Sequence, residues 1–212
     1  MQLPRFTAVR KGFTLVEILI ATAILAALAA GMWEASAYAK AKGLKNTANS
    51  QIQLLETSLN AYRADSGGTL PFGRGDEYSS HVLYKALYCD NDNNGEPDEQ
   101  DGAMMMPYCP SMVVIKNKKE AEQEEGIPAV RAKLTTKEGG KRISGKFFII
   151  MDPWGKPYRY RLGYDVEDER GKTGPGMNPD FDIFSLGPDG LGDGKTNDGD
   201  NEDNISNVRS WK

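Results

Sequence analysis

Two stretches rich in Asp and Asn each place six acids close together, and carboxylates are able to bind a cation. The first runs from Asp90 to Asp101 and has an acid or amide at its first, third, fifth, ninth and twelfth positions, with Gly95 at the sixth. In a Ca²⁺-binding loop this spacing turns alternate oxygen ligands toward one ion, while glycine allows the sharp bend. We therefore expect a calcium site here, and a solvated acidic turn is the alternative. The expected ligands are Asp90, Asp92, Asn94, Glu96 and Asp101.

The second stretch, residues 187–204, has six acids against one lysine in a Gly-rich background. Carboxylates held this close together repel one another unless a cation lies among them. The composition therefore favours a cation-binding loop, and a disordered acidic tail is the alternative. The six acids are Asp189, Asp193, Asp198, Asp200, Glu202 and Asp203.

No set of residues typical of a catalytic centre is present in the sequence. The chain has one histidine, His81, and two cysteines, and no nucleophile stands at a telling spacing from a base. We therefore expect no enzyme, and we expect His81 to lie on the surface or half-buried on a short helix over residues 76–87. The net charge of −4 and the pI of about 5.2, without a basic stripe, do not suggest nucleic-acid binding.

An apolar run from Phe13 to Met32 contains twenty residues and a single charge, Glu17. A helix of that length spans about 30 Å, the thickness of a bilayer core, and the basic leader before it favours a cytoplasmic N-terminus. A carboxylate inside the membrane needs a partner, and none lies nearby within the run. Cleavage after Gly12 would supply one, because Phe13 would gain an α-ammonium. A secretory signal peptide and a plain single-span anchor are the alternatives.

The two cysteines, Cys89 and Cys109, are twenty positions apart. With the basic leader inside the cell, both lie beyond the membrane, where disulfides persist. We therefore predict that they pair, which would stabilise the fold by about 3 kcal/mol on the chain-entropy model. Two separate buried thiols are the alternative.

The residues Lys11-Gly12 followed by Phe13-Thr14-Leu15-Val16-Glu17 resemble the prepilin processing signal of type IV pilins and type II secretion pseudopilins. The resemblance implies cleavage between Gly12 and Phe13 by a prepilin peptidase, N-methylation of Phe13 and a role for Glu17 in assembly. It further implies a cleaved cytoplasmic leader over residues 1–12, a membrane-spanning and filament-core helix half over 13–33, and a periplasmic domain over 34–212.

The helix is expected to continue far beyond the apolar run, because no proline occurs between Pro4 and Pro71. The later apolar positions fall on one helix face. We therefore expect one helix from about Phe13 to about Ala64, on the order of 80 Å long, whose second half is amphipathic. Many relatives have a proline where Glu34 stands, and Gly31 is the nearest weaker helix breaker. The expected buried stripe is Leu44, Ala48, Ile52, Leu55, Leu59 and Tyr62.

Strand-like patterns follow at residues 147–150, 158–162 and 181–186, with turn chemistry between them. The motifs Asp152-Pro-Trp-Gly-Lys-Pro-Tyr158 and Asp182-Ile-Phe-Ser-Leu-Gly-Pro-Asp-Gly190 resemble the C-terminal signature of the major pseudopilin. That resemblance implies an α+β, pilin-like fold in which a small antiparallel sheet and a Ca²⁺ loop, over residues 146–212, follow the long helix. The resemblance leaves residues 89–145 unmatched, and we take them as an insertion. Within it we expect residues 116–142 to be polar and exposed, with one or two helical turns.

The same resemblance implies the ligands of the C-terminal Ca²⁺ site. They would be the carbonyls of Leu186 and Leu191 and the carboxylate of Asp189, completed by two later residues. The chain is longer than the family pattern after Asp189, and an amide stands where an acid is common. The candidates for these later positions are Asp198, Asp200, Asp203 and Asn204.

The function implied by the resemblance is structural. The chain is expected to be a subunit of the pseudopilus, the helical filament of a type II secretion system. It would be a single-pass inner-membrane protein with a periplasmic domain, assembled with copies of itself, with minor pseudopilins and with an inner-membrane assembly platform. The alternative is a type IV pilin of a surface fibre for adhesion, motility or DNA uptake.

Overall fold

The computed structural model describes most of the chain after the leader. The described residues are 12–116, 126–138, 141–167, 174, 176–192 and 204–207. All of the expected leader except Gly12 therefore lies outside them, as do Asp193, Asp198, Asp200, Glu202 and Asp203. The chain forms two compact units, Met1–Gly43 and Leu44–Lys212.

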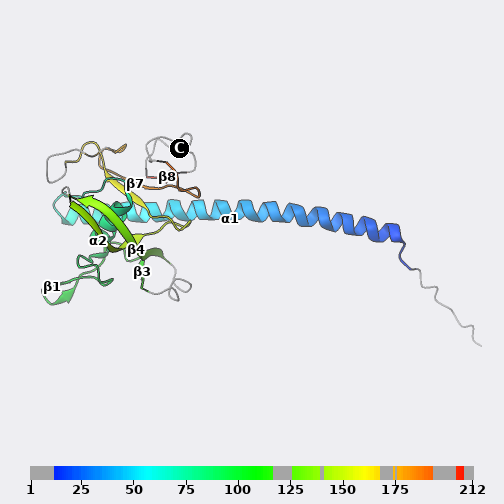
Figure 1. Cartoon of the computed structure of the whole chain (residues 1–212), viewed down its shortest axis with the longest axis horizontal. Coiled ribbons are helices and arrows are strands. Elements are labelled where there is room, and N and C mark those ends of the chain that lie inside the picture. The colour runs from blue at the N-terminus through cyan, green and yellow to red at the C-terminus, as the bar shows by residue number, and fades with distance from the viewer. Residues whose placement is uncertain are drawn as a thin grey trace, which may run out of the picture. The chain divides into compact units, whose positions relative to one another are not determined.

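The long helix is confirmed as a single element, α1 (Leu15–Asp65), which runs through both units (Figure 1). It ends where Gly67 adopts a left-handed backbone with φ of 68° and the Gly68 N–H bonds to the Arg63 carbonyl. This geometry satisfies the last carbonyls of the helix. Within the described residues no helix is long and apolar enough to be assigned as a membrane span, and the span expected over 13–33 stays a prediction.

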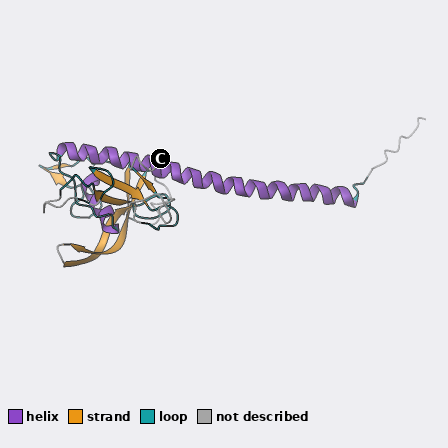
Figure 2. Cartoon of the chain, turned by 90° about the horizontal axis from the view of Figure 1, so that it is seen from above, coloured by secondary structure: helices purple, strands orange, loops and turns teal. Residues whose placement is uncertain are grey.

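In the second unit the expected stripe of α1 faces the core. Ala48, Ile52, Leu55 and Leu59 are almost completely buried in one apolar cluster with residues of the strands. Figure 2 shows the strands beside this part of the helix. The Tyr158 hydroxyl, itself buried, donates to the Gln51 side chain of α1 at 2.8 Å and ties the sheet to the helix by a polar contact.

Three small sheets accompany the helix. The first pairs β1 (Glu99–Gln100) with β2 (Ala103–Met104). The second has the order β3 (Met112–Ile115), β4 (Ile127–Glu138) and β5 (Lys141–Ile150), with β3 parallel to β4. The third is antiparallel, with the order β6 (Arg159–Leu162), β7 (Phe181–Ser185) and β8 (Ile205–Ser206). The fold is α+β, as expected, with a mixed sheet in addition to the antiparallel one.

The middle sheet corrects the expectation of an exposed segment with one or two helical turns over residues 116–142. β4 and the first part of β5 fall within residues 89–145, and the two strands form a hairpin with ten antiparallel register pairs. Apolar and polar residues alternate over the middle of β4, from Val130 to Thr135, so that Leu134 is buried while its neighbours Lys133 and Thr135 are exposed. A period of two is what a sheet with one covered face requires.

A second helix, α2 (Glu77–Tyr88), protects the outer edge of β5. Asp76 caps its N-terminus by accepting the Ser79 N–H at 2.9 Å. The Ser80 hydroxyl donates to the Ile150 carbonyl and accepts the Ile150 N–H, and these bonds occupy the strand edge that β4 leaves free.

His81 is buried on the same helix, with 3% of its surface exposed, so the expectation of a surface or half-buried residue was wrong. Its Nδ1 lies 2.9 Å from the Phe148 carbonyl oxygen. Because a carbonyl only accepts, Nδ1 carries the proton. Desolvation lowers the pKa of His81, which keeps the ring neutral.

The predicted disulfide is not formed in the structure, where Cys89 and Cys109 are both free and buried. Each sulfur has a different partner. The Cys89 thiol points to the Met106 carbonyl at 3.7 Å, whereas the Cys109 thiol contacts the Ser58 hydroxyl of α1. Burial raises the pKa of both thiols, which makes them poor nucleophiles.

Candidate assembly site and metal-binding loops

The expected processing site lies at the open start of α1. Gly12 and Phe13 are exposed, Phe13 with 83% of its surface accessible, and a Cβ built on Gly12 would meet no atom within 4 Å. No neighbouring group among the described residues therefore blocks the peptide bond between them. This arrangement is compatible with cleavage by a peptidase.

Glu17 is held at this helix start by Thr14, a partner that sequence reasoning missed. Its Oε2 accepts hydrogen bonds from the Thr14 N–H and from the Thr14 hydroxyl, both at 2.8 Å. In return the Glu17 N–H donates to the Thr14 hydroxyl at 3.2 Å. This reciprocal pattern is a capping box, and its signal was present in the sequence as Thr-x-x-Glu. The carboxylate is thus oriented toward the residue next to Phe13.

The turn after β5 is built around the carboxylate of Asp152, which is buried. Its Oδ1 accepts the N–H groups of Trp154 at 3.0 Å and Lys156 at 2.8 Å, and Gly155 takes a left-handed φ of 76°. Desolvation raises the pKa of Asp152, although hydrogen bonds from Ser185 and from the turn oppose that shift. The Asp-Pro-Trp-Gly motif therefore forms a turn in which its own Asp152 side chain accepts hydrogen bonds from the backbone.

This turn binds the start of the expected C-terminal calcium loop. The Ser185 hydroxyl donates to Asp152 Oδ2 at 2.5 Å and accepts the Gly187 N–H at 3.0 Å. The Leu186 carbonyl then accepts the Gly190 N–H, and Asp189 Oδ1 accepts the Leu191 N–H at 2.8 Å. Three of the expected ligands, Leu186, Asp189 and Leu191, accordingly lie on one tight turn.

The remaining C-terminal candidates are only partly described. Asn204, immediately before β8, is buried with 6% of its surface exposed. Asp198, Asp200 and Asp203 lie outside the described residues. The ligand set of this loop therefore stays a prediction.

In the loop that begins at Asp90 the structure brings three carboxylates together. One oxygen from each of Asp90, Asp92 and Asp98 lies within 4.8 Å of the others. Asp90 is fully buried and accepts the Tyr84 hydroxyl at 2.6 Å and the Gly95 N–H at 2.8 Å. Hydrogen bonds from the backbone and side chain of Asn91 lower the pKa of Asp98. Three charged oxygens at this spacing suit a hard cation such as Ca²⁺.

The other expected ligands of this loop already have partners or lie in a separate turn. Asn94 bonds within the loop to Asp92 and to the Glu96 N–H, and Glu96 forms an ion pair with Lys116 at 2.8 Å. Asp101 was wrongly expected to close the site. It has a left-handed φ of 54° and, with Gly102, forms the two-residue turn between β1 and β2. Asp-Gly is strongly preferred at such turns.

Two family models match the chain. The prokaryotic N-terminal methylation motif covers residues 8–33, and the type II secretion system protein G model covers residues 111–204. The second match begins inside the segment that was expected to be an insertion. No curated protein and no solved structure matches the chain.

The methylation motif and the pilin-like α+β fold define a prepilin-type protein. Together with the match to the protein G model, this motif supports a type II secretion pseudopilin similar to protein G. The chain is a structural subunit of a pseudopilus and is processed by a prepilin peptidase. The alternative of a type IV pilin for a surface fibre is not better supported.

Proposed function

We propose that the chain assembles through a charge pair between the α-ammonium of Phe13 and the carboxylate of Glu17. The observation that carries this proposal is the capping box. Both hydrogen bonds from Thr14 go to Oε2 of Glu17, and among the described residues no donor bonds to Oε1. After cleavage the new amine lies on the residue next to Thr14. It can then bind Oε1 of its own chain or of a neighbouring copy.

The apolar surface of the first unit supports assembly through this part of α1. Leu15, Leu19, Leu25 and Leu28 each expose more than half of their surface. Large apolar side chains in a row need cover from lipid or from other helices. We propose that lipid of the inner membrane covers them before assembly and that the helices of neighbouring copies cover them in the filament.

The cellular setting follows from this proposal. The basic leader stays on the cytoplasmic side of the inner membrane, and the unit from Leu44 onward folds in the periplasm. A pseudopilin assembles with other components of the secretion system. We propose that these include minor pseudopilins and an inner-membrane assembly platform.

Substitution of Glu17 tests the charge pair. Glu17→Ala and Glu17→Gln should be cleaved after Gly12 but should give few filaments, because neither side chain offers a charge to the Phe13 amine. Glu56→Gln, a change of the same kind on the same helix within the second unit, is the matched control. Cleavage is read by the mass of the purified chain and assembly by electron microscopy of sheared filaments. Normal filaments from Glu17→Ala would refute the pairing.

We further propose that Ca²⁺ binds the C-terminal loop and stabilises it. Leu186 and Leu191 would contribute carbonyls and Asp189 a carboxylate, with the shell completed from Asp198, Asp200, Asp203 and Asn204. The tight turn that groups the first three ligands supports the proposal. Bound Ca²⁺ would neutralise the repulsion between the acids. Removal of Ca²⁺ with EGTA should lower the melting temperature of the processed chain, and an unchanged melting temperature would reject a structural ion.

A second calcium site is proposed at Asp90, Asp92 and Asp98. The double variant Asp92→Ala/Asp98→Ala should bind one Ca²⁺ fewer than the unchanged chain in isothermal titration calorimetry. Asp90 is left intact because its buried bond to Tyr84 supports the fold. Glu99→Ala/Asp101→Ala, which removes two exposed acids from the neighbouring hairpin, is the control. If the two double variants bind the same number of Ca²⁺ ions per chain, the proposed site at Asp90, Asp92 and Asp98 is wrong.

A further inference from the structure

The β4–β5 hairpin gathers cations on one face, which the linear sequence did not reveal. In its register Arg131 is opposite Phe148, Lys133 is opposite Lys146, and Thr135 is opposite Ser144. Residues opposite each other, and those two positions along, share a face of the sheet. Arg142 lies two positions before Ser144 on this face. We call Arg131, Lys133, Arg142 and Lys146 the basic face of the hairpin.

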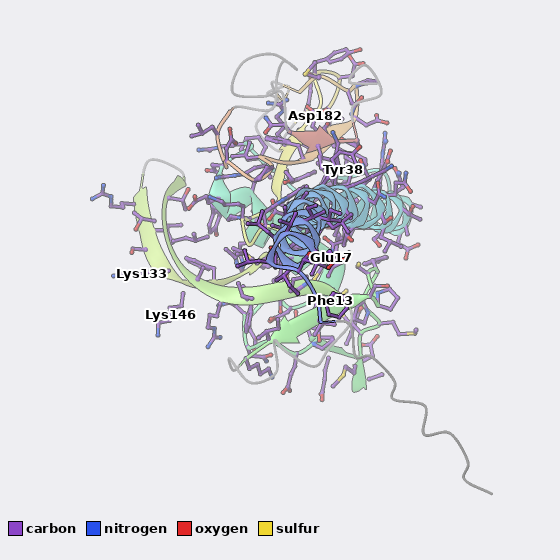
Figure 3. The ribbon with its side chains drawn as sticks, turned by 90° about the vertical axis from the view of Figure 1, so that its right-hand side faces the viewer. Phe13, Glu17, Tyr38, Lys133, Lys146 and Asp182 are labelled. Carbon is purple, nitrogen blue, oxygen red and sulfur yellow. The ribbon has the colours of Figure 1, made fainter. Side chains whose placement is uncertain are left out.

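The four cations of the basic face are turned to solvent, whereas Phe148, at the end of the same face, is buried in the core. All four cations are exposed, and so are Thr135 and Ser144 between them. On the opposite face Leu134 and Ile149 are buried. Figure 3 shows the side chains of Lys133 and Lys146 close together on the outer side of the hairpin. No acid stands among the described exposed positions of this face.

The charges of this face are poorly compensated within the chain. Lys133 and Lys146 are directly opposite each other, and like charges in that relation destabilise a sheet. Neither they nor Arg142 forms an ion pair among the described residues. Arg131 alone is anchored, since it donates to the Asn93 carbonyl at 2.6 Å and lies 4.7 Å from the centre of the Phe148 ring. An anionic partner would relieve this repulsion.

A complementary surface is present on the same unit, at the β1–β2 hairpin. Glu99 and Asp101 are exposed at its end. Beside them Met104 and Met106 expose 61% and 87% of their surfaces. Flexible, exposed methionines are suited to contact with another protein. We call Glu99, Asp101, Met104 and Met106 the acidic tip.

We propose that in the pseudopilus the basic face of one copy binds the acidic tip of a second copy. The inference rests on the filament function and deepens it by naming a contact between subunits. The two surfaces belong to different elements, so one copy uses its basic face while its acidic tip stays available for the next copy. A heterologous contact of this kind propagates into an open helical array. Opposite charges also favour one orientation of the incoming subunit over others.

Charge reversal in the full chain tests the contact. Lys133→Glu/Lys146→Glu should reduce the yield of filaments at physiological salt by about tenfold, because like charges would then face each other across the interface. Glu99→Lys/Asp101→Lys should reduce the yield similarly, and the four changes combined should restore it. Lys42→Glu/Lys45→Glu alters the net charge equally on α1 and should leave the yield unchanged.

Cross-linking gives a second readout that a general folding defect would not produce. Filaments of a chain with Asp101→Cys and Lys146→Cys should yield a ladder of dimers, trimers and longer species on mild oxidation. Chains with either cysteine alone should give no ladder, and a mixture of the two single variants should stop at dimers. Normal filaments without a ladder, together with charge reversal that has no effect, would overturn this contact and leave the filament function standing.

Two other results are also decisive. If the unchanged chain forms no filaments, the filament function fails and the contact fails with it. If reversal of the basic face lowers the yield, the combined variant does not restore it, and binding to phosphatidylglycerol vesicles is lost, the anionic partner is a membrane and the copy-to-copy contact is wrong.

Discussion

Glu17 and Thr14 bind each other reciprocally at the start of α1: Thr14 donates twice to the Glu17 carboxylate, and the Glu17 N–H donates to the Thr14 hydroxyl. The acid that seemed to lack a partner is therefore already hydrogen-bonded within a single chain. These hydrogen bonds do not neutralise the negative charge of the Glu17 carboxylate. The capping box holds that charge at the end of the helix where the proposed cleavage after Gly12 would create an amine. The carboxylate would therefore be oriented before it pairs with that amine.

Thr14→Ala should weaken assembly without preventing cleavage. Loss of an N-cap hydroxyl destabilises a helix start by about 1 kcal/mol, and Glu17 would no longer be oriented toward Phe13. Filament yield per processed chain is the measurement. Thr22→Ala is the matched control, because Thr22 bonds only to the Leu19 carbonyl of its own helix. Equal yields from the two variants would show that the capping box has no part in assembly.

The bond between Asp152 and Ser185 joins the Asp-Pro-Trp-Gly turn to the C-terminal loop. Asp152→Ala should destabilise the folded chain by about 3 kcal/mol, because a buried hydroxyl and two N–H groups lose their acceptor. Ser185→Ala should lower the free energy of unfolding by less than Asp152→Ala does. Since the two side chains share one interaction, the double variant should be less destabilised than the sum of the single variants. Urea denaturation measures all three, and strictly additive losses would argue against direct coupling.

The ion pair between Arg161 and Asp182 is almost completely buried, with a distance of 2.7 Å between Nε and Oδ2. Asp182→Ala would leave a buried guanidinium without a counter-charge and should cost about 3–5 kcal/mol. Asp180→Ala is a close control, because Asp180 pairs with Arg63 on the surface and its loss should cost less than about 1 kcal/mol. Similar unfolding free energies for the two variants would contradict the assigned burial.

The buried imidazole of His81 predicts a specific dependence of stability on pH. Its pKa is lowered in the folded chain, mainly by desolvation and also by Lys85, while Phe148 and Asp90 act in the opposite direction. The unfolded chain therefore takes up a proton first as the pH falls through about 6.5. The contribution of His81 to the free energy of unfolding is therefore fully present above about pH 6.5. It is lost as the pH falls toward the pKa of His81 in the folded chain.

The variant His81→Asn isolates this effect, because its amide can donate to the same Phe148 carbonyl but does not titrate. Between pH 7 and 5 its unfolding free energy should change less than that of the unchanged chain. Asp152 has a raised pKa, so it stabilises the fold as the pH falls, with the opposite sign. Parallel pH curves for the two chains would mean that His81 stays charged or exposed.

The parts of the fold that follow a local period were predictable. The apolar spacing from Leu44 to Tyr62 indicated the second half of α1, and the buried stripe lies where expected. The alternation at 158–162 and 181–186 likewise indicated β6 and β7. The Thr-x-x-Glu spacing of the capping box was also present in the sequence.

Features that depend on distant partners were not predictable. Apolar and polar residues alternate in β4 from Val130 to Leu134, but this short pattern stands in a segment rich in charged residues. The pairing of β4 with β5 forms only when the chain folds. The burial of His81 depends on Phe148, sixty-seven positions away.

In the acidic loop, Asp90 and Asp92 lie close together, as their spacing predicted, and the third carboxylate beside them is that of Asp98. Asp101 is not part of this group, because it forms the turn of the β1–β2 hairpin with Gly102. That the group binds Ca²⁺ stays a prediction.

Intact-mass spectrometry of the chain recovered from sheared filaments tests the central claim most directly. The account predicts a mature chain that has lost residues 1–12 and carries one methyl group on the amine of Phe13. A chain in the filament that still retains residues 1–12 would contradict it, because no amine would then be available to pair with Glu17.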